Sequence, residues 1–143
     1  MEVTAHIVAG DAAEAAAWYA RAFGAEERSR IPLPGGRTMS VEIAIGDSAV
    51  HIGSEFPDFG IVTPLTIGGT ATVLQIETDD ARALWARAVE GGAVVRLELA
   101  EAFWGELHGQ LVDPFGHRWN VAQRIREVSQ EEIVKAAAEA FGD

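Results

Sequence analysis

The side chains with chemical potential fall on segments that read as β-strands, where they alternate with apolar residues. Successive strand residues point to opposite faces, so these groups should share one face of a sheet. Imidazole, amide and carboxylate groups of this kind can hold a small molecule, and a carboxylate or histidine can act as a general base. The set comprises His6, Ser40, Glu42, His51, Gln75, Glu77, His108, Gln110 and Asn120.

Three kinds of chemistry remain open for this set. Glu42 with Glu77 could form a general acid/base pair if burial raised the pKa of one of them, although a solvated or hydrogen-bonded glutamate gives the same pattern. The histidines and Glu42 could form a displaced metal site, but none of their spacings is a local chelate. Nucleophilic catalysis has little support, because the chain has no cysteine and no Gly-x-Ser-x-Gly turn.

Aromatic residues in expected loops could form the walls of a pocket. A flat apolar ligand would pack between such rings, whereas a contact with another subunit would use them equally well. The aromatic residues of the helices and of the last strand, by contrast, are expected to pack between helices and sheets. His117 is expected to be a turn or packing residue. The loop residues are Phe56, Phe59, Phe103 and Trp104, and the packing residues are Trp18, Tyr19, Trp85 and Trp119.

The elements that must position these groups occur twice along the chain. Thr4 to Gly10 reads as a strand, and Asp11 then opens a helix that Gly24 closes. Strand, helix and further strands follow again after residue 69, and the two helices share the text "WYARAF" and "LWARAV". The pattern predicts two modules, at about 1–55 and 70–125, joined by a linker at 56–69.

A separate helix is expected at about 129–141, where Ser129 and Glu132 have capping-box spacing. Its apolar stripe predicts docking on the domain or on a second subunit. The whole chain of 143 residues is therefore expected to form a single α+β domain with mixed sheets.

Composition limits the partners of this domain. The formal charge of −11 opposes binding to nucleic acid and favours a cationic ligand, although acidity could also serve solubility alone. No apolar run reaches the ~20 residues that cross a bilayer, and the N-terminus does not read as a signal peptide. We therefore expect a soluble, cytoplasmic protein without membrane partners.

Three stretches together resemble the vicinal oxygen chelate superfamily, which includes glyoxalase I, extradiol dioxygenases, fosfomycin-modifying enzymes and bleomycin-binding resistance proteins. They are "AAWYARAFGAEE", "IGDS" and "WGELHGQLVDPFGHRW", and the resemblance runs from about Val3 to Arg124. It implies two βαβββ modules whose curved sheets form a cleft. It also implies a homodimer, often with sites shared between the subunits.

Metal-dependent members of that superfamily place ligands on the first and last strand of each module. Carried over, these positions are Thr4, Ser40 or Glu42, Val73 and Asn120. Thr4 and Val73 offer no adequate donor and Asn120 has no carboxylate, so we expect no metal and no other cofactor. The resemblance is greatest to the metal-free, antibiotic-binding branch.

The favoured hypothesis is therefore a dimeric protein that binds an antibiotic or another aromatic natural product and acts by sequestration. The alternatives are a metal-dependent lyase, isomerase or dioxygenase, a metal-free enzyme that uses Glu42 or a histidine as its base, and an interaction module with an occluded cleft. The expected ligand contacts are His6, Ser40, Glu42, His51, Phe56, Phe59, Gln75, Trp104, His108, Gln110 and Asn120.

Overall fold

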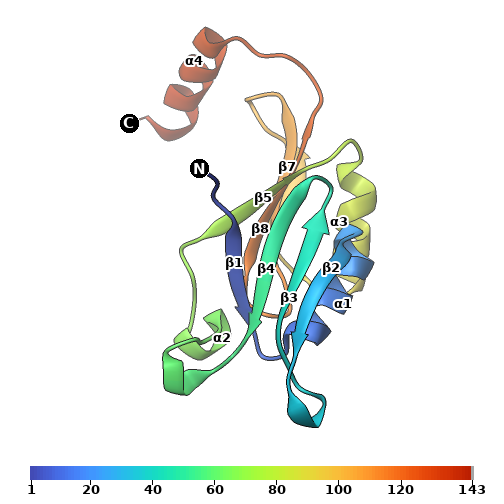
Figure 1. The fold of residues 1–143 in the computed structure, drawn as a ribbon. Helices are drawn as coiled ribbons and strands as arrows, with labels where there is room; N and C mark the ends of the chain where they lie inside the picture. Colours follow the sequence, from blue (N-terminus) through green and yellow to red (C-terminus); the bar gives the residue numbers. More distant parts are fainter. Residues whose placement is uncertain (143) are drawn as a thin grey trace.

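The first module is a four-stranded mixed sheet with one helix on its apolar face (Figure 1). The computed structural model describes residues 1–142. The strand order is β1-β4-β3-β2, in which β1 pairs in parallel with β4 and the other pairs are antiparallel. The elements are β1 (Ala5–Ala9), α1 (Ala12–Phe23), β2 (Glu26–Pro32), β3 (Thr38–Ile45) and β4 (Ser48–Ser54).

The second module repeats this topology, with strand order β5-β8-β7-β6 and a parallel β5–β8 pair. The expected α+β class and the two βαβββ modules are thus confirmed. The elements are β5 (Val73–Glu77), α3 (Ala81–Glu90), β6 (Val94–Glu101), β7 (Glu106–Val112) and β8 (Arg118–Arg124).

The helix ends follow the capping residues that the sequence indicated. The Asp11 carboxylate accepts hydrogen bonds from two N–H groups of the first turn of α1. Gly24 ends that helix with a φ of 70°, a left-handed conformation that glycine adopts without a steric penalty. Asp80 caps α3, and Ser129 caps the C-terminal helix α4 (Gln130–Phe141).

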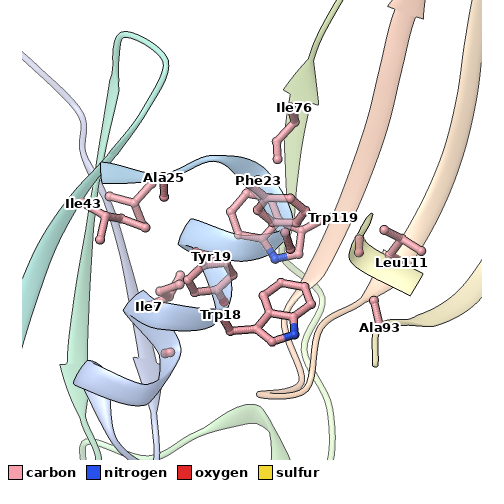
Figure 2. Close-up of a cluster of buried hydrophobic side chains, with 14 of the residues drawn as sticks. Ile7, Trp18, Tyr19, Phe23, Ala25, Ile43, Ile76, Ala93, Leu111 and Trp119 are labelled. Carbon is pink, nitrogen blue, oxygen red and sulfur yellow. The ribbon is translucent and has the colours of Figure 1, made fainter. Parts of the chain in front are cut away.

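A single hydrophobic core joins the two modules. Helix α1 packs on β3 and β4, and its rings also contact residues of the second sheet (Figure 2). Phe23 lies 5.0 Å from Trp119, measured between ring centroids. The expected packing roles are confirmed, because Trp18, Tyr19 and Trp119 are buried and Trp85 packs partly buried against the core.

The Asp113 carboxylate is the polar centre of this junction. It accepts hydrogen bonds from the Tyr19 hydroxyl, from Trp119 Nε1 at 2.8 Å, and from the backbone N–H groups of Phe115 and His117. Burial raises the pKa of Tyr19 well above its ordinary value of about 10, and the negative charge of Asp113 and the hydrogen bond to it raise this pKa further. The Asp-Pro-Phe-Gly turn therefore anchors α1 of the first module to the second sheet.

A second polar contact between the modules involves His117. Its Nε2 atom lies 2.8 Å from the Val8 carbonyl oxygen of β1, so this turn histidine also ties the second module to the first. The indole Nε1 of Trp18 donates to the Gly91 carbonyl at 2.8 Å, directly after α3. These contacts fix the relative orientation of the two sheets.

The linker and the C-terminal helix complete the chain. The linker contains two short helical segments, η2 (Pro57–Phe59) and α2 (Pro64–Ile67), and η1 (Pro34–Gly36) lies between β2 and β3. Figure 1 shows α4 standing apart from the sheets, and none of its residues is buried. A ring contact between Phe103 and Phe141 links it to the body. Within residues 1–142, no helix is long and apolar enough to span a membrane.

Candidate functional site

The predicted polar residues separate into two sets, one on each sheet. Both sheets turn their apolar faces toward the shared core, with α1 between them in Figure 2, so their polar faces point away from the core on opposite sides. Among the described residues, no hydrogen bond, ion pair or aromatic contact given by the structure joins the two sets. The first set is His6, Ser40, Glu42 and His51, and the second is Gln75, His108, Gln110 and Asn120.

A large open groove lies on the polar face of the first sheet. Its volume is about 870 Å³, within the range of roughly 300–1,000 Å³ for small-molecule sites. Three members of the first set and both linker phenylalanines line it. The expected ligand residues at the groove are His6, Ser40, His51, Phe56 and Phe59.

The remaining walls of the groove are aliphatic side chains that the strand pattern did not indicate as ligand contacts. The end of β2 and the residue that follows it, the start of β3 and the linker supply these side chains, several of which are exposed. The sequence feature that could have indicated them is the group of apolar residues on both sides of "PGG" and after "PDFG", in segments that read as turns. These residues are Ile31, Leu33, Met39, Ile61, Val62 and Ile67.

Two stacked imidazoles and a carboxylate stand together on the first sheet. The rings of His6 and His51 lie 5.1 Å apart with an interplanar angle of 21°. His51 Nε2 lies 3.3 Å from Glu42 Oε1, and the Ser29 hydroxyl is 3.5 Å from the other carboxylate oxygen. The Glu42 carboxylate thus lies beside the His51 imidazole, and the exposed His6 ring offers a flat surface for stacking.

The second sheet carries a directed chain of amide hydrogen bonds. Gln110 Nε2 donates to Asn120 Oδ1 at 2.9 Å, and Asn120 Nδ2 donates to Gln75 Oε1 at 3.5 Å. Arg118 donates to Gln110 at one end, and Gln75 donates to Glu77 at the other. In each amide the oxygen therefore points toward the Arg118 end of the row and the nitrogen toward the Glu77 end, so all three amides have the same orientation.

Trp104 and His108 lie near the β6–β7 turn, at one end of the second polar face. Trp104 Nε1 donates to the Glu106 carboxylate, and its ring meets His108 edge-on at 5.2 Å. Phe103 contacts Trp104 at 4.9 Å. These rings form a separate aromatic cluster, and none of them lines the groove of the first sheet.

The register of the strands relates the two polar sets. His6 of β1 pairs with His51 of β4, as Gln75 of β5 pairs with Asn120 of β8. The third strand of each module, β3 or β7, then supplies the next neighbour. Equivalent positions therefore hold titratable groups in the first module and neutral amides in the second. The equivalent pairs are His6 with Gln75, His51 with Asn120, and Glu42 with Gln110.

The donors at the carried-over metal positions do not fit a divalent ion. Val73 has no donor, and both functional atoms of Asn120 belong to the amide chain. Ser40 and Glu42 lie on β3, whereas the last strand of the first module carries His51. The histidines near Glu42 stack face to face, and one of them, His51, contacts the Glu42 carboxylate directly. Within residues 1–142, no group of three His, Asp or Glu side chains could hold a metal.

Comparison with known proteins agrees with this architecture. An uncharacterized protein of Mycobacterium bovis is 36% identical over 141 residues, covering 96% of this chain and 92% of that protein. A structure from Pseudomonas aeruginosa superposes with a TM-score of 0.73 at 19% identity, covering 88% of this chain and 99% of that one. FosX, a fosfomycin resistance protein from Mesorhizobium loti, gives a TM-score of 0.63 at 14% identity, covering 94% and 97%.

Both structural similarities concern the fold, because the sequence identities are low. The family evidence is independent of them and spans most of the chain. Residues 3–121 match the family model described as "Glyoxalase/Bleomycin resistance protein/Dioxygenase superfamily". This chain is therefore a member of the glyoxalase/bleomycin resistance protein/dioxygenase superfamily.

Proposed function

We propose that the chain binds a flat, largely apolar small molecule, of the antibiotic or aromatic natural product type, and acts by sequestering it. The observation that carries this proposal is the groove of about 870 Å³ on the first sheet. Its aliphatic and aromatic walls surround a floor with few polar groups, which is the usual chemistry of a small-molecule site. The chain's net charge of −11 favours a cationic ligand through long-range attraction.

His6 and His51 give the groove its polar, aromatic floor. Their stacked rings offer a surface on which a flat ligand can lie, and Ser40 adds a hydroxyl donor or acceptor. Phe56 and Phe59 close one side, and Phe59 is 81% exposed before any ligand binds. Covering this ring with ligand removes apolar surface from water, which favours binding.

The groove is open, and a second copy of the chain is the partner that would cover it. In one chain the two polar sets lie on opposite sides of the core, so they can face one another only across a subunit interface. A homodimer that places the second sheet of one copy over the groove of the other would unite them. Sedimentation of the purified protein should then give twice the chain mass of 15.3 kDa. A monomer at working concentrations would rule out this arrangement.

Gly53 provides a direct test of the groove. It lies on the groove floor, and an added Cβ would come no nearer than 4.0 Å to its nearest neighbouring heavy atom, so a leucine fits the backbone and fills the groove. We expect proflavine, a flat aromatic cation, to bind the wild type, and Gly53→Leu to abolish binding. Gly10→Leu is the matched control, because Gly10 has open space around its Cβ position and does not line this groove.

The result is read by isothermal titration, with circular dichroism to verify folding. Equal binding by wild type and Gly53→Leu would refute the groove as the site. A screen of aromatic natural products by thermal shift then extends the test beyond the probe. If no compound raises the melting temperature of the wild type, sequestration of this ligand class is refuted.

The second candidate is a metal-free enzyme in which Glu42 is the general base. It is favoured by the 3.3 Å contact between Glu42 and His51, which provides a carboxylate with a proton partner beside the groove. Mass spectrometry of a bound compound separates the two functions. Sequestration predicts that the compound is recovered unchanged, whereas a base predicts turnover that Glu42→Gln abolishes while binding persists.

A further inference from the structure

Two arginines share a second pocket, between the second module and the linker, that has no acidic residue in its lining. The pocket has a volume of about 450 Å³, and none of its lining residues lines the groove of the first sheet. Among the described residues, neither arginine takes part in a salt bridge, although the chain carries twice as many acidic as basic side chains. The lining is Pro64, Leu65, Gly68, Gly69, Thr70, Arg96, Val112, Gly116 and Arg118.

Hydrogen bonds hold the Arg118 guanidinium in place and leave two of its N–H groups without a protein acceptor among residues 1–142. Its Nε and Nη2 atoms donate to Gln110 Oε1 at 3.1 and 2.7 Å, and Nη1 donates to the Thr70 carbonyl at 3.4 Å. A guanidinium has five N–H groups, so two remain after these three bonds. The contacts fix the plane of the group, which reduces the entropy lost when a ligand binds.

Arg96 reaches the same pocket because of an irregularity in β6. The strand pairs Val95 with Leu111 and Leu97 with Gln110, which leaves Arg96 as the extra residue of a bulge. A bulge of this kind changes the direction of a side chain and interrupts regular pairing. Arg96 is exposed and lines the pocket together with Arg118.

We propose that this pocket binds an oxyanion, a carboxylate or a phosphate, that carries a short apolar body. Paired guanidinium groups match the oxygen geometry of both anions. Pro64, Leu65 and Val112 supply an apolar wall beside the arginines. The absence of a carboxylate in the lining means that an incoming anion displaces no internal ion pair. No residue of this pocket lines the groove of the first sheet in the same chain.

The experiment uses inorganic phosphate and benzoate as probes, with benzamide as the neutral counterpart of benzoate. Each is titrated into the isotopically labelled protein while the amide resonances of Thr70 and Gly116 are followed. We expect saturable shifts with benzoate and none with benzamide. Saturation by phosphate as well would identify the anionic charge as the main determinant, and saturation by benzoate alone would identify a carboxylate with an apolar body.

Arg96→Gln removes one guanidinium without disturbing the bonds of Arg118. We expect this variant to weaken benzoate binding by roughly tenfold or more, the order expected for a hydrogen bond to a charged group. Arg82→Gln is the matched control, because it removes the same charge from the exposed surface of α3. The proposal is overturned if neither anion shifts the two amides, or if Arg82→Gln weakens binding as much as Arg96→Gln.

Discussion

Replacing Tyr19 with phenylalanine removes one hydrogen bond from the junction between the modules. Tyr19 has no exposed surface, and Asp113 is only 4% exposed. A hydrogen bond to a charged group contributes about 1.5–3 kcal/mol to stability. Asp113 keeps its bonds to the Trp119 indole and to two backbone N–H groups, so the carboxylate is not left unpaired. We therefore expect Tyr19→Phe to lower the free energy of unfolding by about 2 kcal/mol.

Urea denaturation measures this loss. With a slope of about 1–3 kcal/mol per molar urea, the midpoint should fall by roughly 1 M while the slope stays unchanged. Thr4→Val is the matched control, since the Thr4 hydroxyl also bonds a carboxylate, that of Glu2, but at 3.4 Å and at the surface. That variant should stay within about 0.5 kcal/mol of the wild type. A loss no larger than the control's in Tyr19→Phe would refute the reasoning.

Alkaline pH gives a second reading of the same contact. Burial first, and then Asp113, raises the pKa of Tyr19 above its unfolded value of about 10. The corresponding stability is complete below pH 10 and is lost as the pH rises toward the folded-state pKa. Tyr19 is the chain's one tyrosine, so tyrosinate absorbance should rise together with unfolding. Titration near pH 10 in the folded protein would contradict this account.

Two further predictions concern the linker and the second sheet. Hydrogen bonds from the Thr66 hydroxyl and the Thr63 N–H lower the pKa of Glu55 below its ordinary value of about 4.5. The contact between Glu55 and the linker should therefore persist above pH 4.5 and be lost as the pH falls through the lowered pKa of Glu55. The chemical shift of the Thr63 amide, followed against pH, measures this loss. A titration midpoint at or above pH 4.5 would argue against the contact. Gly109→Ala should destabilise the fold by roughly 1–3 kcal/mol, because the new Cβ would lie 2.6 Å from the Trp85 ring. Thermal unfolding measures this loss. An unchanged melting temperature would show that the Trp85 ring moves aside freely.

The fold could be predicted from the sequence because its signals are local or repeated. Asp11 and Gly24 mark the ends of α1 through their own backbone preferences, which need no tertiary contact. The shared text of the two helices indicated a duplicated module, and the two sheets have the same topology. The short turns of the segment from 56 to 69 were harder to predict from the sequence, because they depend on contacts such as that between Glu55 and Thr63.

The candidate site was predicted less completely, for a physical reason. Alternation along a strand assigns each residue to a face but does not say which way that face points within the molecule. The orientation of the sheets depends on contacts between residues far apart in sequence, such as Tyr19 with Asp113. The polar residues were therefore predicted to share one face, while their separation on opposite sides of the core was not foreseen. Arg96 was missed because its position depends on a bulge.

The matched registers of the two modules have a consequence for symmetry. A duplicated backbone offers a ligand two equivalent half-sites, and equal side chains would let it bind in either of two orientations. Here the paired positions carry imidazoles and a carboxylate in one half and amides in the other. The pseudo-twofold relation is thus retained by the main chain and broken by the side chains. Across a subunit interface of the kind proposed above, a ligand between these two halves would therefore meet different side chains at each of its ends.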